Sequence, residues 1–388
     1  MIYHLLDFLQ SKQVIYVNPF QYITVRAAAA MALALLLSIK AGPWVVAALR
    51  RLKAGQPIRT VSIKGAPDLA EMHGKKAGTP TMGGVLIIFS LLLGVFMFCN
   101  LLNPLVWLLV LVTFGFGAVG FMDDYLKITK KNSDGLSARH KILGQVVMGL
   151  FVGVYLYYFG RTGVLPVTYT YYESVGGMQG PFRGYGHILV PFLKWAYPAI
   201  GAFFVLYCVL VLTGTSNAVN LTDGLDGLCI GITTLVTLTF MVVAYIASNK
   251  NLSGYLMLPY VARADEVVVF LGALTGACLG FLWFNAYPAD MFMGDTGSLT
   301  LGGIIGTVAL ITKQELLLAI VGGIYVLEAV SVMLQVGSFR LFNRRVFLMA
   351  PIHHHYERKG MAESKIIARF WIVTALLALV ALSSLKLR

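Results

Sequence analysis

The sequence predicts an all-α, polytopic membrane protein with about ten transmembrane helices and both termini in the periplasm. Of the 388 residues, 58% are hydrophobic and only 12% are charged. The mean hydropathy of +0.78 leaves too few polar side chains to cover a soluble domain. Long apolar runs recur along the chain, and Lys and Arg gather in alternate connections between them. Composition, periodic apolar runs and charge asymmetry therefore indicate the same class.

The apolar runs define the expected helices, since crossing the hydrocarbon core takes about 20 residues. They cover residues 22–39, 81–101, 104–122, 142–159, 195–213, 225–247, 266–284, 298–311, 315–335 and 366–385. No internal repeat and no soluble domain interrupt them, so residues 1–388 are expected to form one membrane domain. The first 20 residues hold no small-residue cleavage site, and we expect the first span to act as its own insertion signal.

The orientation follows from the positive charges, because Lys and Arg collect in cytoplasmic loops. They concentrate after the first, third and ninth spans. This places both termini outside, residues 161–194 in a periplasmic excursion, and residues 338–365 in a cytoplasmic interfacial segment. We expect a multi-pass protein of the bacterial inner membrane. The net charge of +13 is then explained by loops held against anionic headgroups, and nucleic acid is not an expected partner.

Five polar motifs fall in connections that this topology places in the cytoplasm. They are GTPTMGG at 78–84, DDYLK at 123–127, NLTDGLDG at 220–227, the segment from NAYP to FMGDTGS at 285–298, and PIHHHYE at 351–357. The four cysteines lie in apolar runs without ligand spacing and are expected to be buried small hydrophobes.

The adjacent carboxylates of Asp123 and Asp124 repel one another and need a compensating cation. Lys127, one helical turn away, is one candidate. A hard divalent cation such as Mg²⁺, which prefers oxygen ligands, is the other. Alternatively, the two aspartates are solvated at headgroup level.

Each remaining motif also has a structural interpretation. The third motif has a polar residue at every third position: Asn220, Asp223 and Asp226. These side chains would share one face if the motif were part of the next helix. Alternatively, Asn220 or Thr222 could cap that helix. Asp295 or Thr296 could likewise cap the eighth span, although the flanking glycines and a helix N-terminus also suit a phosphate.

The histidines 353–355 suit hydrogen bonding or charge interactions with an anionic substrate, with zinc binding or an interfacial basic patch as alternatives. Together, the five motifs indicate metal-assisted chemistry on a phosphorylated, amphipathic substrate.

In their residues and their order, these motifs resemble the signatures of the phospho-N-acetylmuramoyl-pentapeptide-transferase family. The resemblance extends over nearly the whole chain. The resemblance implies an Mg²⁺-dependent transfer of phospho-N-acetylmuramoyl-pentapeptide from its UDP derivative to undecaprenyl phosphate, giving lipid I and UMP. The partners would be both substrates and membrane lipids, and the oligomeric state, a homodimer included, stays open. Alternatives are a transferase that uses another UDP-N-acetylhexosamine and, more distantly, an ion-coupled transporter. The 161–194 excursion is longer than expected for the family.

The resemblance also implies roles for individual residues. Asp295 would be the leading Mg²⁺ ligand, while Asp123 and Asp124 would activate or orient the lipid phosphate and help to hold the metal. The residues that would line the nucleotide-sugar site, with Phe292 stacked on uracil, are Asn220, Leu221, Asp223, Gly224, Leu225, Asp226, Asn285, Phe292 and Gly294. Those that would contact phosphates are Lys76, Thr81, Lys127 and Lys141. His353, His354 and His355 would bind substrate or neutralise phosphate. Whether Asp123 removes a proton or positions the nucleophile is open, and direct attack by the lipid phosphate is favoured over an aspartyl-phosphate.

Overall fold

The computed structural model of this chain describes residues 1–14, 16, 18–52, 78–130, 135–169, 184–193 and 197–387. Each predicted span corresponds to a helix. These helices are α2 (Ile23–Arg51), α4 (Gly84–Phe98), α5 (Pro104–Lys130), α6 (Ala138–Arg161), α8 (Phe204–Thr222), α9 (Leu228–Ser248), α11 (Asp265–Asn285), α12 (Gly294–Ile311), α13 (Glu315–Val321) with α14 (Gly323–Phe342), and α16 (Glu363–Ser384). Within the described ranges, nine helices are long and apolar enough to cross a membrane, and α4 is a shorter apolar helix. The all-α, polytopic membrane class is therefore confirmed.

Shorter elements join these helices at their ends. They are α1 (Ile2–Ser11), α10 (Lys250–Leu256), α15 (Ile352–Arg358), the 3₁₀ turns η1 (Pro19–Gln21) and η3 (Gly201–Phe203), and the strands β1 (Val167–Tyr169) and β2 (Pro259–Val261). The two strands pair antiparallel, with Thr168 opposite Tyr260. β1 thereby ties the described start of the 161–194 excursion to the connection between α10 and α11. Residues 170–183 and 194 of the excursion lie outside the described part.

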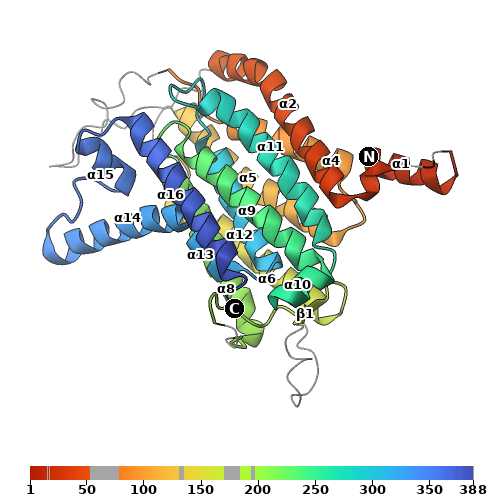
Figure 1. Cartoon of the computed structure of the whole chain (residues 1–388). Coiled ribbons are helices and arrows are strands. Elements are labelled where there is room, and N and C mark those ends of the chain that lie inside the picture. Colours follow the sequence, from red (N-terminus) through yellow and green to blue (C-terminus); the bar gives the residue numbers. More distant parts are fainter. Residues whose placement is uncertain are drawn as a thin grey trace.

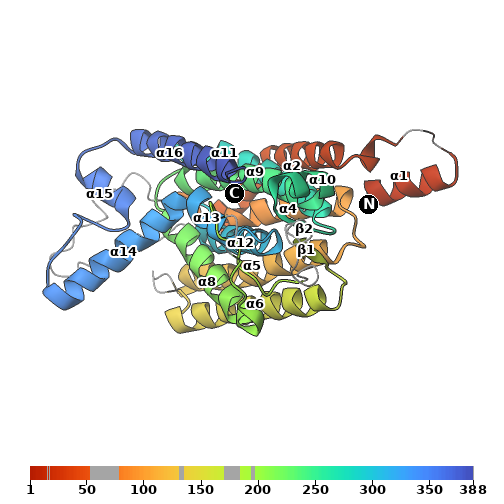
Figure 2. The ribbon, with the colours of Figure 1, turned by 60° about the horizontal axis from the view of Figure 1, so that its bottom comes forward.

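Helix α12 lies in the middle of the bundle. Figure 2 shows α2, α9, α11 and α16 on one side of it and α5, α6 and α8 on the other. Almost every residue of α12 is buried, and small residues let its neighbours approach closely. A Cβ on Gly84 of α4 would lie 2.2 Å from the backbone nitrogen of Gly297, and one on Gly302 would lie 2.6 Å from the Cα of Ser216 in α8. Close backbone packing of this kind is how helices associate where the solvent is itself apolar.

Several expected boundaries are wrong. The first and third spans, predicted to end at residues 39 and 122, continue to Arg51 and Lys130, so DDYLK lies in α5 and not in a connection. The ninth span, predicted as one helix over 315–335, is broken at Gly322 into α13 and α14. Adjacent glycines at 322 and 323 weaken the helix there, and α14 then leaves the bundle at an angle (Figures 1 and 2). The fifth span, predicted from residue 195, begins at Phe204 after the turn η3, because Gly201 has a left-handed φ of 53°.

Both termini lie at the end of the bundle opposite the start of α4 and α12. The terminal amine of Met1 donates to the carbonyl of Phe96, near the end of α4. At the other terminus, the ammonium of Lys386 lies 3.5 Å from the ring centroid of Tyr255 in α10. The common side of the two termini agrees with the predicted topology. That this side is the periplasm stays a prediction.

Candidate active site

Three carboxylates from two helices meet at one end of the bundle. Asp123 and Asp124 lie near the end of α5, and Asp295 lies in the first turn of α12. One ligand oxygen from each of the three lies within 4.8 Å of the others. Asp123 and Asp124 are only 1% and 2% exposed. Buried carboxylates this close together require compensating positive charge or donated hydrogen bonds.

Asp124 uses its oxygens to cap α12 from a neighbouring helix. It accepts hydrogen bonds from the backbone N–H of Asp295 (3.1 Å) and of Thr296 (2.8 Å), and from the hydroxyl of Thr296 (2.7 Å). These amides are among those that a helix start leaves without intrahelical partners. The suggestion that Asp295 or Thr296 caps α12 is therefore wrong, and the side chain of Asp295 is available for other contacts.

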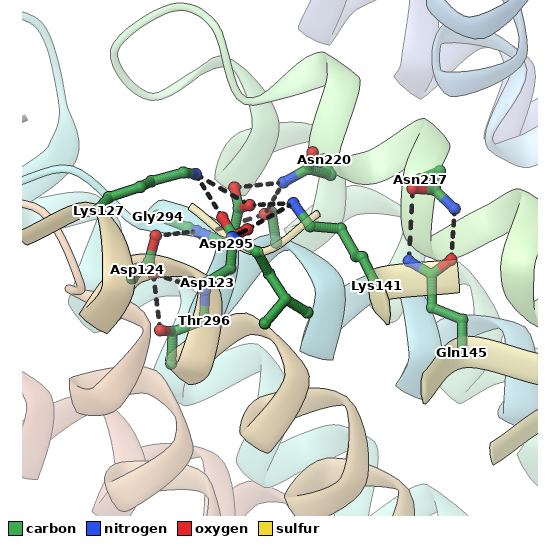
Figure 3. Close-up of polar contacts among 12 residues, drawn as sticks. Asp123, Asp124, Lys127, Lys141, Gln145, Asn217, Asn220, Gly294, Asp295 and Thr296 are labelled. Carbon is green, nitrogen blue, oxygen red and sulfur yellow. Dashed lines mark hydrogen bonds and ion pairs between the residues drawn. The ribbon is translucent and has the colours of Figure 1, made fainter. Parts of the chain in front are cut away.

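Two lysines reach Asp123 and Asp295 from opposite sides (Figure 3). Lys127 lies 2.5 Å from an oxygen of Asp123 and 3.1 Å from one of Asp295. Lys141, near the start of α6, lies 3.3 Å and 2.6 Å from the same two carboxylates. Lys127 thus links α5 to α12, and Lys141 links α6 to both. Because Asp123 and Asp124 are buried, the alternative of an aspartate pair solvated at headgroup level is wrong. Because two ammonium groups face three carboxylates, the cluster can accept further positive charge, and its all-oxygen donor set fits a hard divalent cation.

Asn220 connects the end of α8 to the same cluster. Its side-chain amide donates to Asp295 (2.8 Å) and to the hydroxyl of Ser298 (2.8 Å). One turn earlier, the amide of Asn217 donates to Gln145 of α6 at 2.7 Å, and Figure 3 shows this pair beside Lys141. The first contact holds the end of α8 against α12, and the second holds it against α6.

The segment from Asp223 to Gly227 is a connection, not the start of the sixth helix. α8 continues to Thr222 and α9 begins at Leu228, with Gly227 at a left-handed φ of 79°. Residues 220–226 therefore do not wind into the sixth span, and the alternative that Asn220 or Thr222 caps this helix is wrong as well. The hydroxyl of Thr222 instead donates back to the carbonyl of Ala218 within α8.

Some residues that were expected to bind substrate instead form hydrogen bonds within the protein. Asp226 accepts from the backbone N–H of Ala289 (3.1 Å). Asn285 accepts from Gly227 N–H (3.0 Å) and donates to the carbonyl of Met291 (2.9 Å). Asp226, Asn285 and Leu225 are buried, so they shape the connection from within.

The other residues of this region that were expected to bind substrate are at least partly accessible to solvent. Leu221 and Asp223 are half-buried, Gly224 is exposed, and Phe292 is half-buried. Burial raises the pKa of the Asp223 carboxyl well above its usual value, and repulsion from Asp295 and Asp124 raises it further.

The first motif is attached to the fourth by backbone hydrogen bonds. Gly83 and Gly84 donate to the carbonyls of Phe292 and Met293 (both 2.9 Å), and Phe292 donates to Pro80 (2.8 Å). Gly294 has a left-handed φ of 74°, and a Cβ there would lie 2.9 Å from the hydroxyl of Thr81 and 2.6 Å from Asp124. Thr81 is therefore beside the aspartates, whereas Lys76 lies outside the described residues.

The three histidines of α15 make three different contacts. His353 is buried, with Nδ1 3.1 Å from the carboxylate of Glu328. His354 Nδ1 lies 2.6 Å from Glu357, and His355 Nδ1 accepts from the backbone N–H of Leu348 at 3.1 Å. Among the described residues, the group of three or more His, Cys, Asp and Glu that could hold a metal ion consists of the aspartates alone, so zinc binding by the histidines gains no support.

His353 links the fifth motif to the third, since a Cβ on Gly224 would lie only 2.2 Å from its Nε2. All five motifs therefore meet at one end of the bundle. Sequence reasoning missed Glu328 and Glu363, which contact the fifth and third motifs, and the Gln145–Asn217 pair beside Lys141. It also gave no role to Ser298 of the fourth motif, which accepts from Asn220. The sequence did contain a sign of a functional role for Glu328, because a carboxylate inside an apolar run is unusual.

Comparison with known sequences agrees with this geometry. Residues 106–313 match the profile of glycosyl transferase family 4, and residues 76–88 match phospho-N-acetylmuramoyl-pentapeptide-transferase signature 1. The chain is 49% identical over 388 residues to the phospho-N-acetylmuramoyl-pentapeptide-transferase of Citrifermentans bemidjiense, 47% over 390 residues to that of Desulfotalea psychrophila and 46% over 389 residues to that of Syntrophus aciditrophicus. Each alignment covers 100% of both chains. The chain is thus a transferase that belongs to glycosyl transferase family 4 and, within it, to the phospho-N-acetylmuramoyl-pentapeptide-transferase family.

Proposed function

We propose that this chain transfers phospho-N-acetylmuramoyl-pentapeptide from its UDP derivative to undecaprenyl phosphate, with Mg²⁺, at the cytoplasmic face of the bacterial inner membrane. The products are lipid I and UMP. The observation that carries the proposal is the cluster of Asp123, Asp124, Asp295, Lys127 and Lys141, which the structure holds together at one end of an apolar bundle. A lipid phosphate and a soluble nucleotide can meet only where the membrane surface and a charged site coincide.

The main obstacle to the reaction is the mutual repulsion of two anionic substrates. A phosphate monoester has a second pKa of about 6, so an oxygen of the lipid phosphate is already ionised near neutral pH. That oxygen forms a bond to the β-phosphorus, and the bond from this phosphorus to the oxygen bridging to the α-phosphate breaks. UMP leaves with the bridging oxygen. A strong general base is not needed, which favours positioning by Asp123 over proton removal.

Lys127 and Lys141 are placed to lower this repulsion. In the structure, each ammonium group contacts both Asp123 and Asp295, so a short side-chain movement would present it to a phosphate. Asp295 and Asp123 would hold Mg²⁺, which supplies charge neutralisation for the pyrophosphate when bound. Asp124 is committed to the amides of α12 and supports the site by fixing the direction of Asp295.

A direct attack by lipid phosphate is also favoured by the surroundings of Asp123. Its carboxylate is almost fully buried and accepts from the backbone N–H of Leu136 at 2.8 Å. An aspartyl-phosphate would need this side chain to leave both lysines and reach the β-phosphorus. We assign the nucleotide-sugar site to the exposed side of the 220–227 connection, with Phe292 beside it, because Leu221, Asp223 and Gly224 present surface there.

The test is a reconstitution of the purified chain with undecaprenyl phosphate and the UDP-N-acetylmuramoyl-pentapeptide, with and without Mg²⁺. We expect a lipid-soluble product and stoichiometric UMP, both lost on chelation of the metal. A parallel reaction with UDP-N-acetylglucosamine separates the proposal from a related transferase: turnover with this nucleotide alone would contradict it. Lack of product with either nucleotide from folded protein would defeat transferase activity on this acceptor.

A further inference from the structure

A buried carboxylate outside the five motifs lies directly behind one of the histidines. Glu328 belongs to the apolar helix α14, and its side chain is completely buried. One of its oxygens lies 3.1 Å from Nδ1 of His353 and 3.5 Å from the backbone nitrogen of the same residue. An ionisable residue held inside an apolar helix is costly unless it is paired, and it is usually functional. Burial of Glu328 therefore needs an explanation that the apolar packing of α14 does not supply.

The other side of the His353 ring faces the connection between α8 and α9. A Cβ on Gly224 would come within 2.2 Å of Nε2 and 2.8 Å of Cε1 of this ring. His353 is itself 1% exposed. Neither of its ring nitrogens makes a hydrogen bond within the described part of the chain, so the 3.1 Å between Nδ1 and Glu328 is a close approach without the alignment of a hydrogen bond. The ring thus stands between a carboxylate on α14 and the connection that carries Asp223.

From this arrangement we infer that Glu328 is a positioning residue for His353. This inference rests on the proposed function, for which the 223–227 connection borders the nucleotide-sugar site. A carboxylate beside Nδ1 favours a proton on that nitrogen and fixes the orientation of the ring. Nε2 is then the nitrogen presented toward Gly224. Because α14 leaves the bundle immediately after the break at Gly322, Glu328 also ties the α14–α15 arm to the site end.

The expected consequence is that Glu328 acts only through His353. Glu328→Gln keeps the size of the side chain but removes its charge. Carboxylates that orient metal-bound histidines are worth roughly 10- to 100-fold, and we take this as the scale for His353. We expect a loss of this order in kcat/KM, with the same division between kcat and KM that His353→Gln shows. Glu328→Asp, which keeps the carboxylate, should recover part of the loss.

The decisive experiment is a double-mutant comparison in the lipid I assay. If Glu328 acts through His353, Glu328→Gln combined with His353→Gln is no slower than His353→Gln alone. Glu266→Gln serves as the matched control, because it removes an equally buried carboxylate at the opposite end of the bundle, where Glu266 pairs with Arg26 at 2.6 Å. Any fold-reduction in kcat/KM caused by Glu266→Gln should multiply with the fold-reduction caused by His353→Gln.

The outcomes separate this inference from the proposed function. An inactive wild-type chain would refute the function itself. An active wild type in which the Glu328 and His353 effects multiply, or in which Glu328→Gln is as fast as wild type, would refute the positioning role alone. Thermal unfolding of each variant identifies folded protein. Should Glu328→Gln not fold, the same comparison is made with Glu328→Asp, whose loss must likewise vanish in the His353→Gln background.

Discussion

Asp124 and Asp295 belong to the same carboxylate cluster, but their contacts indicate different roles. Asp124 accepts three hydrogen bonds from the first turn of α12. Asp295 receives two ammonium groups and the amide of Asn220. The first arrangement is that of a helix cap, and the second is that of a group that can exchange partners when substrate or metal arrives. Two carboxylates of one cluster thus have unequal roles.

Replacement of each aspartate by asparagine should therefore have a different signature. Asp295→Asn should abolish Mg²⁺-dependent UMP release while the thermal unfolding temperature changes little. Asp124→Asn should lower both, because a neutral amide accepts fewer and weaker hydrogen bonds from the start of α12, a loss of about 1–3 kcal/mol. Unfolding followed by intrinsic fluorescence in detergent, beside the release assay, distinguishes them. An unchanged unfolding temperature for Asp124→Asn would contradict its role as a cap.

Asp223 supports a separate prediction about pH. Its raised pKa means that the folded chain binds this proton more tightly than the unfolded chain does. The proton therefore stabilises the fold at low pH, and this contribution is lost as the pH rises through the folded-state pKa. Asp223→Asn removes a half-buried group that must ionise close to Asp295 and Asp124. Relative to wild type, the variant should gain more unfolding temperature at pH 8 than at pH 5, because only part of the stabilisation by the proton has been lost at pH 5.

A matching variant at Asp226 provides the control, since its carboxylate accepts from Ala289 N–H in the same connection. Asp226→Asn should lower the unfolding temperature at both pH values. A gain for Asp223→Asn that was equal at pH 5 and pH 8 would rule out ionisation as its cause.

At the scale of helices, the position of α12 depends on glycines in the helices that touch it. A Cβ on Gly120 of α5 would lie 2.2 Å from the carbonyl oxygen of Asp295 and 2.7 Å from the Cα of Thr296. All of the nearest atoms are backbone, so no side chain can rotate away. The contact sets how closely the end of α5, with Asp123 and Asp124, approaches the start of α12.

Gly120→Ala should therefore damage both stability and turnover, although alanine is the better helix former by about 1 kcal/mol. The clash separates α5 from α12 and draws Asp295 away from Asp123. Gly214→Ala in α8 is the matched control, because no neighbouring atom of the described residues lies within 4 Å of the place that its Cβ would take; it should be neutral or slightly stabilising. Unfolding temperature and lipid I formation are measured for both, and equal behaviour of the two variants would contradict the close-contact argument.

The helices themselves were largely predictable, for reasons that also explain the errors. Apolar runs long enough to span a bilayer identified the core of every long helix, since composition dominates there. Hydropathy does not register a break between two apolar segments, so α13 and α14 were joined across Gly322. It also extended the fifth span to residue 195, although α8 starts at Phe204.

The sequence predicted which motifs form the site, but not which residues contact one another within it. The five motifs were placed at one end by charge alternation alone, and the structure brings them together there. That Asp124 would cap a helix 171 residues away in sequence, or that Asn285 would be enclosed between Gly227 and Met291, depends on tertiary packing. No local pattern encodes such contacts, and chemically identical residues therefore could not be separated by role.

For the molecule as a whole, the structure defines two ends, and the distribution of charge predicts which compartment each one faces. The end with the aspartate cluster also carries the exposed arginines 340, 344 and 345 on the α14–α15 arm, whereas the opposite end carries both termini. Positive-inside orientation puts the arginines and the active site in the cytoplasm. An inverted protein could not reach a nucleotide substrate made inside the cell.

Cysteine labelling in intact cells tests this orientation with a pair of exposed basic positions. Lys12 follows α1 at one end and Arg345 lies on the arm at the other, and both are exposed, while the four native cysteines are buried and give a silent background. We expect Lys12→Cys to react with a membrane-impermeant maleimide in intact cells whose outer membrane has been permeabilised. Arg345→Cys should react only after the inner membrane is broken. The reverse pattern would place the aspartates and lysines on the periplasmic side, where UDP-linked substrate is absent, and the proposed reaction could not then proceed from this face.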